Sequence, residues 1–126
     1  MVLVKDGLYY TKTHEWVKLD GDIATVGLTD FAQEQLTDIV YVDLPKVGAM
    51  LKAGETAGTV ESVKSAEDYY SPLTGKVMEV NKELEKTPEL INKDPYGAWI
   101  FKLKVSNPSE VSSLLSKTDY EKILKK

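Results

Sequence analysis

Lys64 is the residue whose surroundings best suit chemistry, because it lies between two β-rich runs that must reverse direction. Residues 56–63 and 68–71 are predicted to be strands, and residues 64–67 the tight turn that joins them. A lysine at the tip of such a hairpin projects its ammonium into solvent from a fixed backbone. An enzyme that modifies lysine needs this arrangement, although most lysines on turns are only solvated charges.

The other side chains offer little chemistry of their own. The chain has no cysteine, so any thiol chemistry requires sulfur from a cofactor. A single histidine, His14, cannot build a histidine metal cluster or a serine–histidine relay, so we predict no metal site and no catalytic residues. All basic residues are lysine and the formal net charge is −4, which disfavours nucleic acid and membrane as partners.

Short elements must hold the turn at Lys64 in place. Further strands are predicted at residues 16–19, 23–28, 39–42, 76–80 and 99–105. Helices are predicted at residues 30–36 after a Thr29 cap, around 88–91, at 108–115, and at 119–125 after a capping box of Thr118 and Glu121. The order of elements predicts a mainly β sandwich or barrel, a single domain over residues 1–126 with residues 107–126 as a helical tail packed on it.

A valine–glycine pair and a further glycine precede Lys64, and a proline and a glycine follow it. They are Val47, Gly48, Gly54, Pro72 and Gly75. This pattern resembles the lipoyl and biotinyl carrier domains, in which the modified lysine lies at a hairpin turn between two quasi-symmetric halves. Biotin carriers have methionine on both sides of that lysine, and lipoyl acyltransferase domains have aspartate before it and alanine after it. The run 61–64, Glu-Ser-Val-Lys, instead resembles the H proteins of the glycine cleavage system.

The resemblance to H proteins extends over nearly the whole chain. The matching segments are residues 10–17, 26–36, 38–45, 81–84, 88–92, 94–97 and 120–124. Two departures are visible, because Thr37 stands where a glycine is common and residues 97–99 are one residue shorter than usual. The resemblance implies a barrel-sandwich hybrid fold with a short internal helix and a C-terminal helical tail.

The resemblance also implies a function and a set of partners. H proteins carry lipoate in amide linkage on the lysine, here Lys64, and act as substrates of other enzymes. They take the aminomethyl group of glycine from a pyridoxal-phosphate decarboxylase (P protein) to an aminomethyltransferase (T protein). They pass electrons to dihydrolipoamide dehydrogenase (L protein), and a further enzyme attaches the lipoate. The expected role is therefore a carrier and not an enzyme.

The resemblance assigns roles to residues around Lys64. Thr13, Glu15 and Asp68 are expected to line a cleft for the aminomethyl arm, where a carboxylate would bond its ammonium. The expected recognition hairpin for partner enzymes consists of Glu61, Ser62, Val63, Ser65 and Glu67. We interpret His14 as a structural histidine, and Trp16 and Trp99 as packing residues.

Other functions stay open at this stage. An H-like protein can relay lipoate to the acyltransferases of 2-oxoacid dehydrogenases, and this is the main alternative. A biotin carrier, an unmodified binding module and an independent enzyme fit the sequence less well. The start of the chain is too short and too soon polar for a signal peptide. We therefore expect a bacterial or archaeal cytoplasm, or the mitochondrial matrix for a mature eukaryotic chain.

Overall fold

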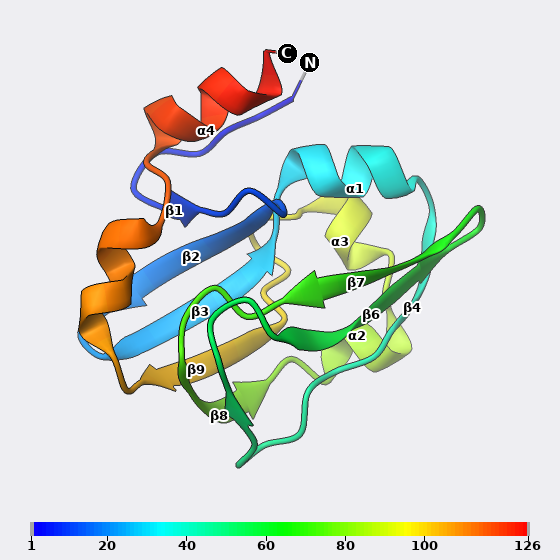
Figure 1. The fold of residues 1–126 in the computed structure, drawn as a ribbon. Helices are drawn as coiled ribbons and strands as arrows, with labels where there is room; N and C mark the ends of the chain where they lie inside the picture. Colours follow the sequence, from blue (N-terminus) through cyan, green and yellow to red (C-terminus); the bar gives the residue numbers. More distant parts are fainter. Residues whose placement is uncertain (1, 126) are drawn as a thin grey trace.

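The computed structural model describes residues 2–125 as two antiparallel sheets with short helices around them (Figure 1). The larger sheet has the strand order β1 (Tyr9–Tyr10), β2 (Glu15–Asp20), β3 (Ile23–Leu28), β9 (Phe101–Val105), β8 (Gly75–Val80) and β5 (Met50–Leu51). The smaller sheet has the order β4 (Ile39–Val42), β6 (Thr56–Ser62) and β7 (Ala66–Tyr70). The predicted mainly β fold is confirmed.

The helices lie at the ends and edges of the sheets. They are α1 (Asp30–Leu36), α2 (Glu83–Lys86), α3 (Leu90–Lys93), a 3-10 helix η1 (Pro108–Ser113) and α4 (Lys117–Leu124). The predicted cap of α1 is confirmed, since the Thr29 hydroxyl accepts a hydrogen bond from the Ala32 N–H at 3.2 Å. This cap fixes the direction in which α1 leaves β3, and so places the helix beside the β6–β7 hairpin.

A hydrophobic core fills the space between the two sheets. Inward-facing residues of both sheets contribute to it, including Val26, Val60 and Leu103, each almost fully buried. Gly58 lets the strands approach closely, because a Cβ there would collide with the Asp43 carbonyl and the Tyr69 ring. The Tyr69 hydroxyl instead donates to that carbonyl at 2.6 Å, which fastens the smaller sheet to the segment after β4.

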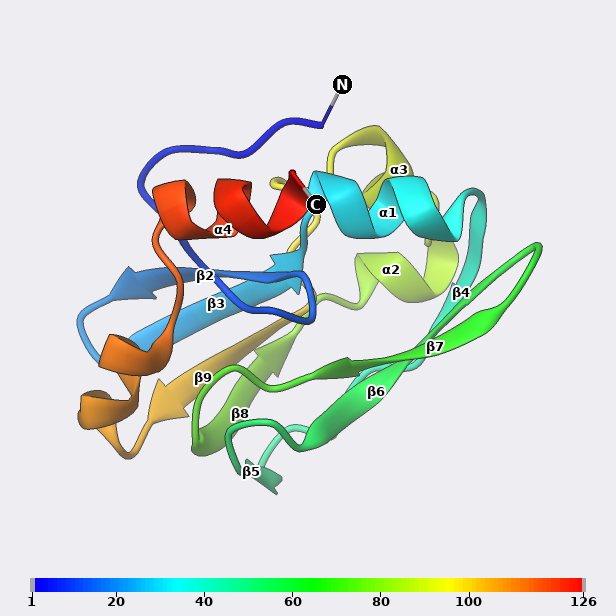
Figure 2. The same ribbon diagram turned by 45° about the horizontal axis from the view of Figure 1, so that its top comes forward.

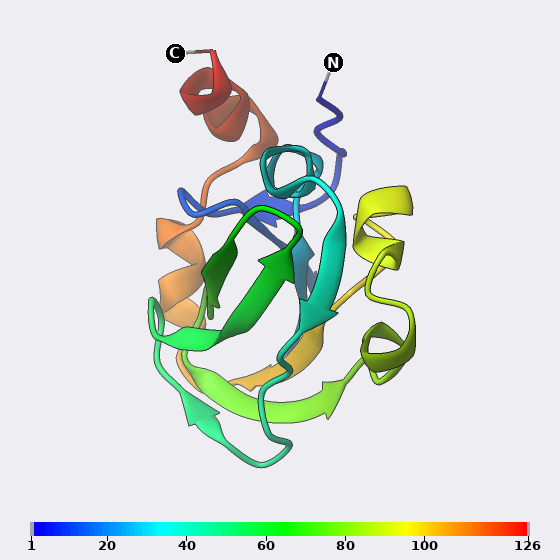
Figure 3. The same ribbon diagram turned by 90° about the vertical axis from the view of Figure 1, so that its right-hand side faces the viewer.

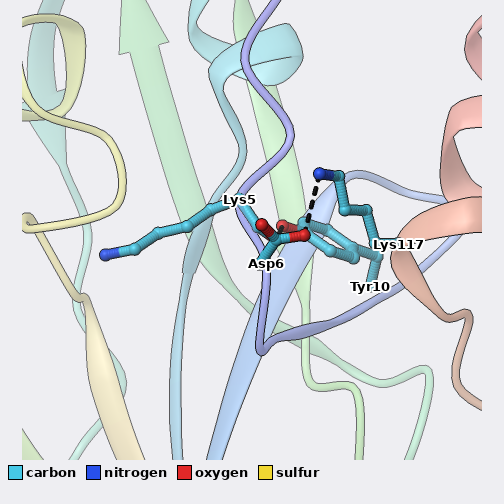
Figure 4. Close-up of polar contacts among 4 residues, drawn as sticks. All are labelled: Lys5, Asp6, Tyr10 and Lys117. Atoms are coloured by element: carbon cyan, nitrogen blue, oxygen red, sulfur yellow. Dashed lines mark hydrogen bonds and ion pairs between the residues drawn. The ribbon is translucent and has the colours of Figure 1, made fainter.

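A second cluster joins the beginning and the end of the described chain. Val4, Tyr10, Trp16 and Tyr120 form its buried centre, and the rings of Tyr10 and Tyr120 stack with centroids 4.6 Å apart. The N-terminal segment and α4 lie together above β2 (Figure 2). Figure 4 shows an exposed Lys117–Asp6 ion pair of 2.8 Å beside Tyr10. Because this pair is solvated, the apolar cluster is the main attachment of α4.

Several predicted boundaries are wrong. Strand β7 begins at Ala66, so the turn is shorter than residues 64–67, and the last strand begins at Phe101 and not at 99. The polar stretch before residue 94 holds two helical turns, α2 and α3. Residues 108–113 form a 3-10 helix without a side-chain cap. Helix α4 is capped by Ser116, not Thr118, because the Ser116 hydroxyl accepts from the Asp119 N–H at 3.1 Å.

Thr37 is strained, and this leads to a stability prediction. It ends α1 at φ 63° and ψ −145°, a backbone region that β-branched residues rarely adopt and glycine adopts freely. We expect Thr37→Gly to raise the free energy of unfolding by about 1 kcal/mol, since relieved strain exceeds the added entropy of the unfolded chain. Urea unfolding measures this. Thr37→Ala is the control, because it removes the hydroxyl and keeps the Cβ; an equal gain in both variants would contradict the strain explanation.

Candidate functional site

The predicted turn at Lys64 is a compact reversal at the tip of a projecting hairpin. In Figure 1 the β6–β7 hairpin, in green, extends past the body of the protein. The Ser62 N–H donates to the Ser65 carbonyl at 2.7 Å, and the Ser62 hydroxyl accepts from the Lys64 and Ser65 N–H groups at 3.3 and 3.2 Å. The backbone of Lys64 is thus held by its neighbours while its side chain is exposed.

A second contact supports the tip of the hairpin from the β4 edge of the same sheet. The Val63 N–H donates to the Asp38 carbonyl at 3.0 Å, so the segment that leads into β4 supports the turn. The Val63 side chain is 67% exposed beside Lys64. Of the predicted recognition hairpin, Glu61, Val63 and Glu67 are exposed, whereas Ser62 and Ser65 are half-buried and hold the turn. Its exposed members are therefore accessible to another protein.

A pocket of about 520 Å³ opens next to the hairpin. Its lining comes from residues 12–15, from one face of α1, and from β7 with the turn before it, including Lys64. Figure 3 shows α1 directly above the hairpin, which explains how the helix and β7 form opposite walls. Thr13, Glu15 and Asp68 all line this pocket. The three residues expected in one cleft are thus brought together beside Lys64.

Glu15 is the buried acid of the pocket. Its side chain accepts hydrogen bonds from the Thr11 and Thr13 hydroxyls and, at 3.1 Å, from the Tyr70 N–H of β7. The residue is only 1% exposed, and this burial raises the pKa of its carboxyl, while the hydrogen bonds act in the opposite direction. Glu15 therefore connects the loop before β2 to the edge of β7 and supplies a preorganised acceptor.

Two further carboxyl groups lie near the mouth of the pocket. Asp68 pairs with Thr59 across the β6–β7 ladder, and its carboxylate accepts from the Thr59 hydroxyl at 3.3 Å. Glu67 pairs with the inward-facing Val60, and it also lines the pocket. The sequence predicts Glu67 only in the recognition hairpin. The structure also places it in the pocket lining, which strand alternation could have indicated.

Sequence reasoning missed the helical wall of the pocket. Phe31 and Gln35 of α1 line it, and so does Lys12. Phe31 and Gln35 are four residues apart and so share one face of the helix, which was a usable signal once the helix had been predicted. His14, interpreted as structural, also lines the pocket and bonds through Nδ1 to the Tyr120 hydroxyl at 2.8 Å. Trp16 and Trp99 pack in or against the second cluster.

The rest of the described chain offers no rival site of two common kinds. Within residues 2–125, no group of three or more His, Cys, Asp and Glu side chains is arranged to hold a metal ion. Among the same residues, no helix combines the length and apolar character that a membrane-spanning helix requires. The hairpin and its adjoining pocket are therefore the candidate functional site.

Comparison with known proteins identifies the family. The model of the glycine cleavage H-protein family matches residues 8–126. The chain is 60% identical over 124 residues to a probable glycine cleavage system H protein of Thermoplasma volcanium, covering 98% of this chain and 99% of that protein. The chain belongs to the glycine cleavage H-protein family. This membership supports a lipoyl carrier role, and it confirms the resemblance seen in the sequence.

Other members of the H-protein family agree in sequence and in structure. The glycine cleavage system H protein of Carboxydothermus hydrogenoformans is 51% identical over 125 residues, covering 98% of this chain and 96% of that protein. The crystal structure of a glycine cleavage system H protein from Mycobacterium marinum has a TM-score of 0.89 at 35% identity, covering 98% of this chain and 100% of that one. The H-protein fold is thus shared, whereas the roles of Lys64 and the pocket residues stay predictions.

Proposed function

We propose that this chain carries lipoate in amide linkage on Lys64 and shuttles the aminomethyl group of glycine between the enzymes of the glycine cleavage system. The observation that carries the proposal is an exposed lysine, on a braced turn, next to a pocket that contains a buried carboxyl group. An attaching enzyme can reach the amine, and the resulting long arm can fold back into the pocket. The dithiol of lipoate supplies the sulfur that a chain without cysteine lacks.

The pocket suits a cationic cargo. An aminomethyl group bound through sulfur carries an ammonium, and three acidic residues, Glu15, Glu67 and Asp68, line the pocket that it would enter. A carboxylate that accepts from an ammonium forms a strong, short hydrogen bond, and it keeps the nitrogen protonated. Phe31 and Leu28 add an apolar lining that limits water. The residues of this chain therefore bind, protect and release the cargo, and the partner enzymes perform the chemistry.

The hairpin is proposed as the surface that partner enzymes recognise. Glu61 and Glu67 are exposed on it, and modification of Lys64 would remove the one positive charge between them. We infer partners of four kinds: a P protein, a T protein, an L protein and a lipoate-attaching enzyme. We further propose a single carrier domain with residues 107–126 as its tail, located in a bacterial or archaeal cytoplasm. The bacterial and archaeal relatives support that location.

The experiment that tests this function is decarboxylase-dependent exchange of labelled bicarbonate into glycine. The lipoylated chain is mixed with a P protein, glycine and the label, and the unlipoylated chain serves as the control. We expect exchange only with the lipoylated chain, because the carrier accepts and returns the aminomethyl group. Lipoylation without exchange would refute the glycine-cleavage role. Transfer of lipoate from the chain to a 2-oxoacid dehydrogenase acyltransferase would then support the relay alternative.

A further inference from the structure

His14 occupies a strained position in the wall of the pocket. Its φ is 71°, a left-handed conformation that a non-glycine residue adopts at a cost. Two backbone bonds hold it there: its N–H donates to the Thr11 carbonyl at 3.1 Å, and its carbonyl accepts from the Thr29 N–H at 3.0 Å. Strain that the surrounding structure enforces often marks a functional position. Here it places His14 in the pocket lining, with its imidazole against Phe31 of α1.

The imidazole ring itself is fixed on two sides. Its Nδ1 lies 2.8 Å from the Tyr120 hydroxyl of α4, and its ring packs on Phe31 with centroids 4.6 Å apart. Because Nδ1 is engaged with Tyr120, Nε2 is the ring nitrogen left to bond an occupant of the pocket. Burial lowers the pKa of His14, so the ring is held neutral near pH 7 and carries one proton on one of its two nitrogens.

The Tyr120 hydroxyl connects His14 to a second hydroxyl. It lies 2.7 Å from the Thr29 Oγ1, and both Tyr120 and Thr29 are fully buried. Thr29 also caps α1 by accepting from the Ala32 N–H. Two proton arrangements are compatible with this chain. In one, Nδ1–H donates to Tyr120, whose hydroxyl donates to Thr29; the buried Thr29 hydroxyl then has no acceptor for its own proton among the described residues, so this arrangement is the costlier one. In the other, Thr29 donates to Tyr120, whose hydroxyl donates to Nδ1.

These two arrangements give Nε2 opposite hydrogen-bonding properties. With the proton on Nδ1, Nε2 presents a lone pair, which accepts from an ammonium. With the proton on Nε2, the same atom is a donor, which suits a sulfur atom or a carbonyl oxygen. We propose that His14, Tyr120 and Thr29 form a tautomer-adaptable wall, whose histidine tautomer follows the state of the arm in the pocket. This inference rests on the proposed function, and it gives α4 a role in the site.

The adaptation would solve a problem that carboxylates alone leave unsolved. A lipoyl carrier must hold a cationic aminomethyl arm and then a neutral thiol or disulfide arm in one place. Glu15 suits the cation, but it offers no donor to the neutral arm when ionised. A histidine that changes tautomer keeps its charge at zero and changes only which hydrogen bond it makes. The hydrogen bonds between Nδ1, Tyr120 and Thr29 persist in both states, and the bond from the ammonium to Nε2 would offset the unpaired Thr29 proton in the loaded state.

Nitrogen-15 NMR of the imidazole tests this directly, because His14 is the single histidine of the chain and its signals are unambiguous. We expect the unloaded lipoyl form to carry its proton mainly on Nε2, and the form loaded from glycine and P protein to carry it mainly on Nδ1. A tautomer that is the same in both forms overturns the inference. Failure to load at all is a different result, because it would overturn the proposed function.

Tyr120→Phe removes the hydroxyl and keeps the ring stacked on Tyr10. We expect it to shift the imidazole signals even in the unlipoylated chain, and to shorten the lifetime of the loaded form by roughly two- to tenfold, the effect of one neutral hydrogen bond. Tyr10→Phe is the matched control: it lies in the same cluster and loses a bond to the Lys5 carbonyl, but it does not contact Nδ1. Unchanged imidazole signals in Tyr120→Phe, or equal shifts in both variants, would contradict the inference.

Discussion

Lys64→Arg is expected to abolish lipoylation and, with it, all carrier activity. Arginine keeps the positive charge at the exposed tip, and the turn bonds of Ser62 involve only backbone groups of its neighbours, so the fold should be unaffected. The guanidinium, however, is weakly nucleophilic because it stays protonated, so it cannot take the place of the lysine amine in an amide bond. The intact mass of the variant after incubation with lipoate, ATP and a lipoate ligase measures the effect.

The matched control is Lys76→Arg, which changes another exposed lysine, on β8 in the larger sheet. It should gain a lipoyl group at the wild-type rate. Far-ultraviolet circular dichroism and the unfolding midpoint should be alike for both variants and the wild type. A mass gain in Lys64→Arg would show that another lysine is the attachment site, and it would contradict the account of the hairpin.

Glu15→Gln is expected to leave lipoylation intact and to shorten the lifetime of the aminomethyl-loaded form by roughly tenfold or more. The estimate follows from the loss of one charge-assisted hydrogen bond to the ammonium. The glutamine side chain can still accept from Thr11 and Thr13, but its amide cannot accept from the Tyr70 N–H. Loss of the aminomethyl group over time, followed by intact mass at neutral pH, gives the lifetime.

Glu61→Gln is the control for Glu15→Gln, because it removes a carboxylate from the exposed part of the same hairpin. Glu61 pairs with Ala66 and does not line the pocket. We expect its loaded form to last as long as that of the wild type. If both variants lose the group equally fast, general electrostatics and not the buried carboxylate would protect the cargo.

Glu15 also predicts how stability depends on pH. Because burial raises the pKa of its carboxyl, the folded state binds the proton more tightly than the unfolded chain does. The free energy of unfolding therefore falls as pH rises from the ordinary carboxyl pKa through the raised value. Above that pH window the cost of burying an ionised Glu15 is fully present, and below the window this cost is absent. In Glu15→Gln this part of the pH dependence should disappear. Urea titrations of both proteins across acidic pH measure it, and an equal pH dependence in the two proteins would contradict this prediction.

Some features of the site could be predicted from the sequence because they depend on local chain chemistry. The turn at Lys64 follows from two β-rich runs with a short polar gap, and the Thr29 cap follows from a residue type with a local bonding pattern. The family resemblance then brought Thr13, Glu15 and Asp68 to one cleft. None of these steps required knowledge of how distant segments pack.

The remaining features depend on long-range packing, which local patterns do not encode. Tyr120 and His14 are 106 residues apart, and nothing near either residue indicates that their polar atoms meet. The same applies to the helical wall of the pocket, which exists only because α1 lies above β7. The misplaced cap of α4 has a different cause: Ser116 and Thr118 both suit the N-cap position by residue type, and the structure places Ser116 there.

Peptide mapping of the loaded chain tests the central claim most directly. The chain is lipoylated, incubated with glycine and a P protein, digested, and its peptides are sequenced by mass spectrometry. The account predicts one lipoyl group, on Lys64, carrying one aminomethyl group whose formation requires both glycine and P protein. A lipoyl group on any other lysine, or a lipoylated Lys64 that never gains the aminomethyl group, would contradict it.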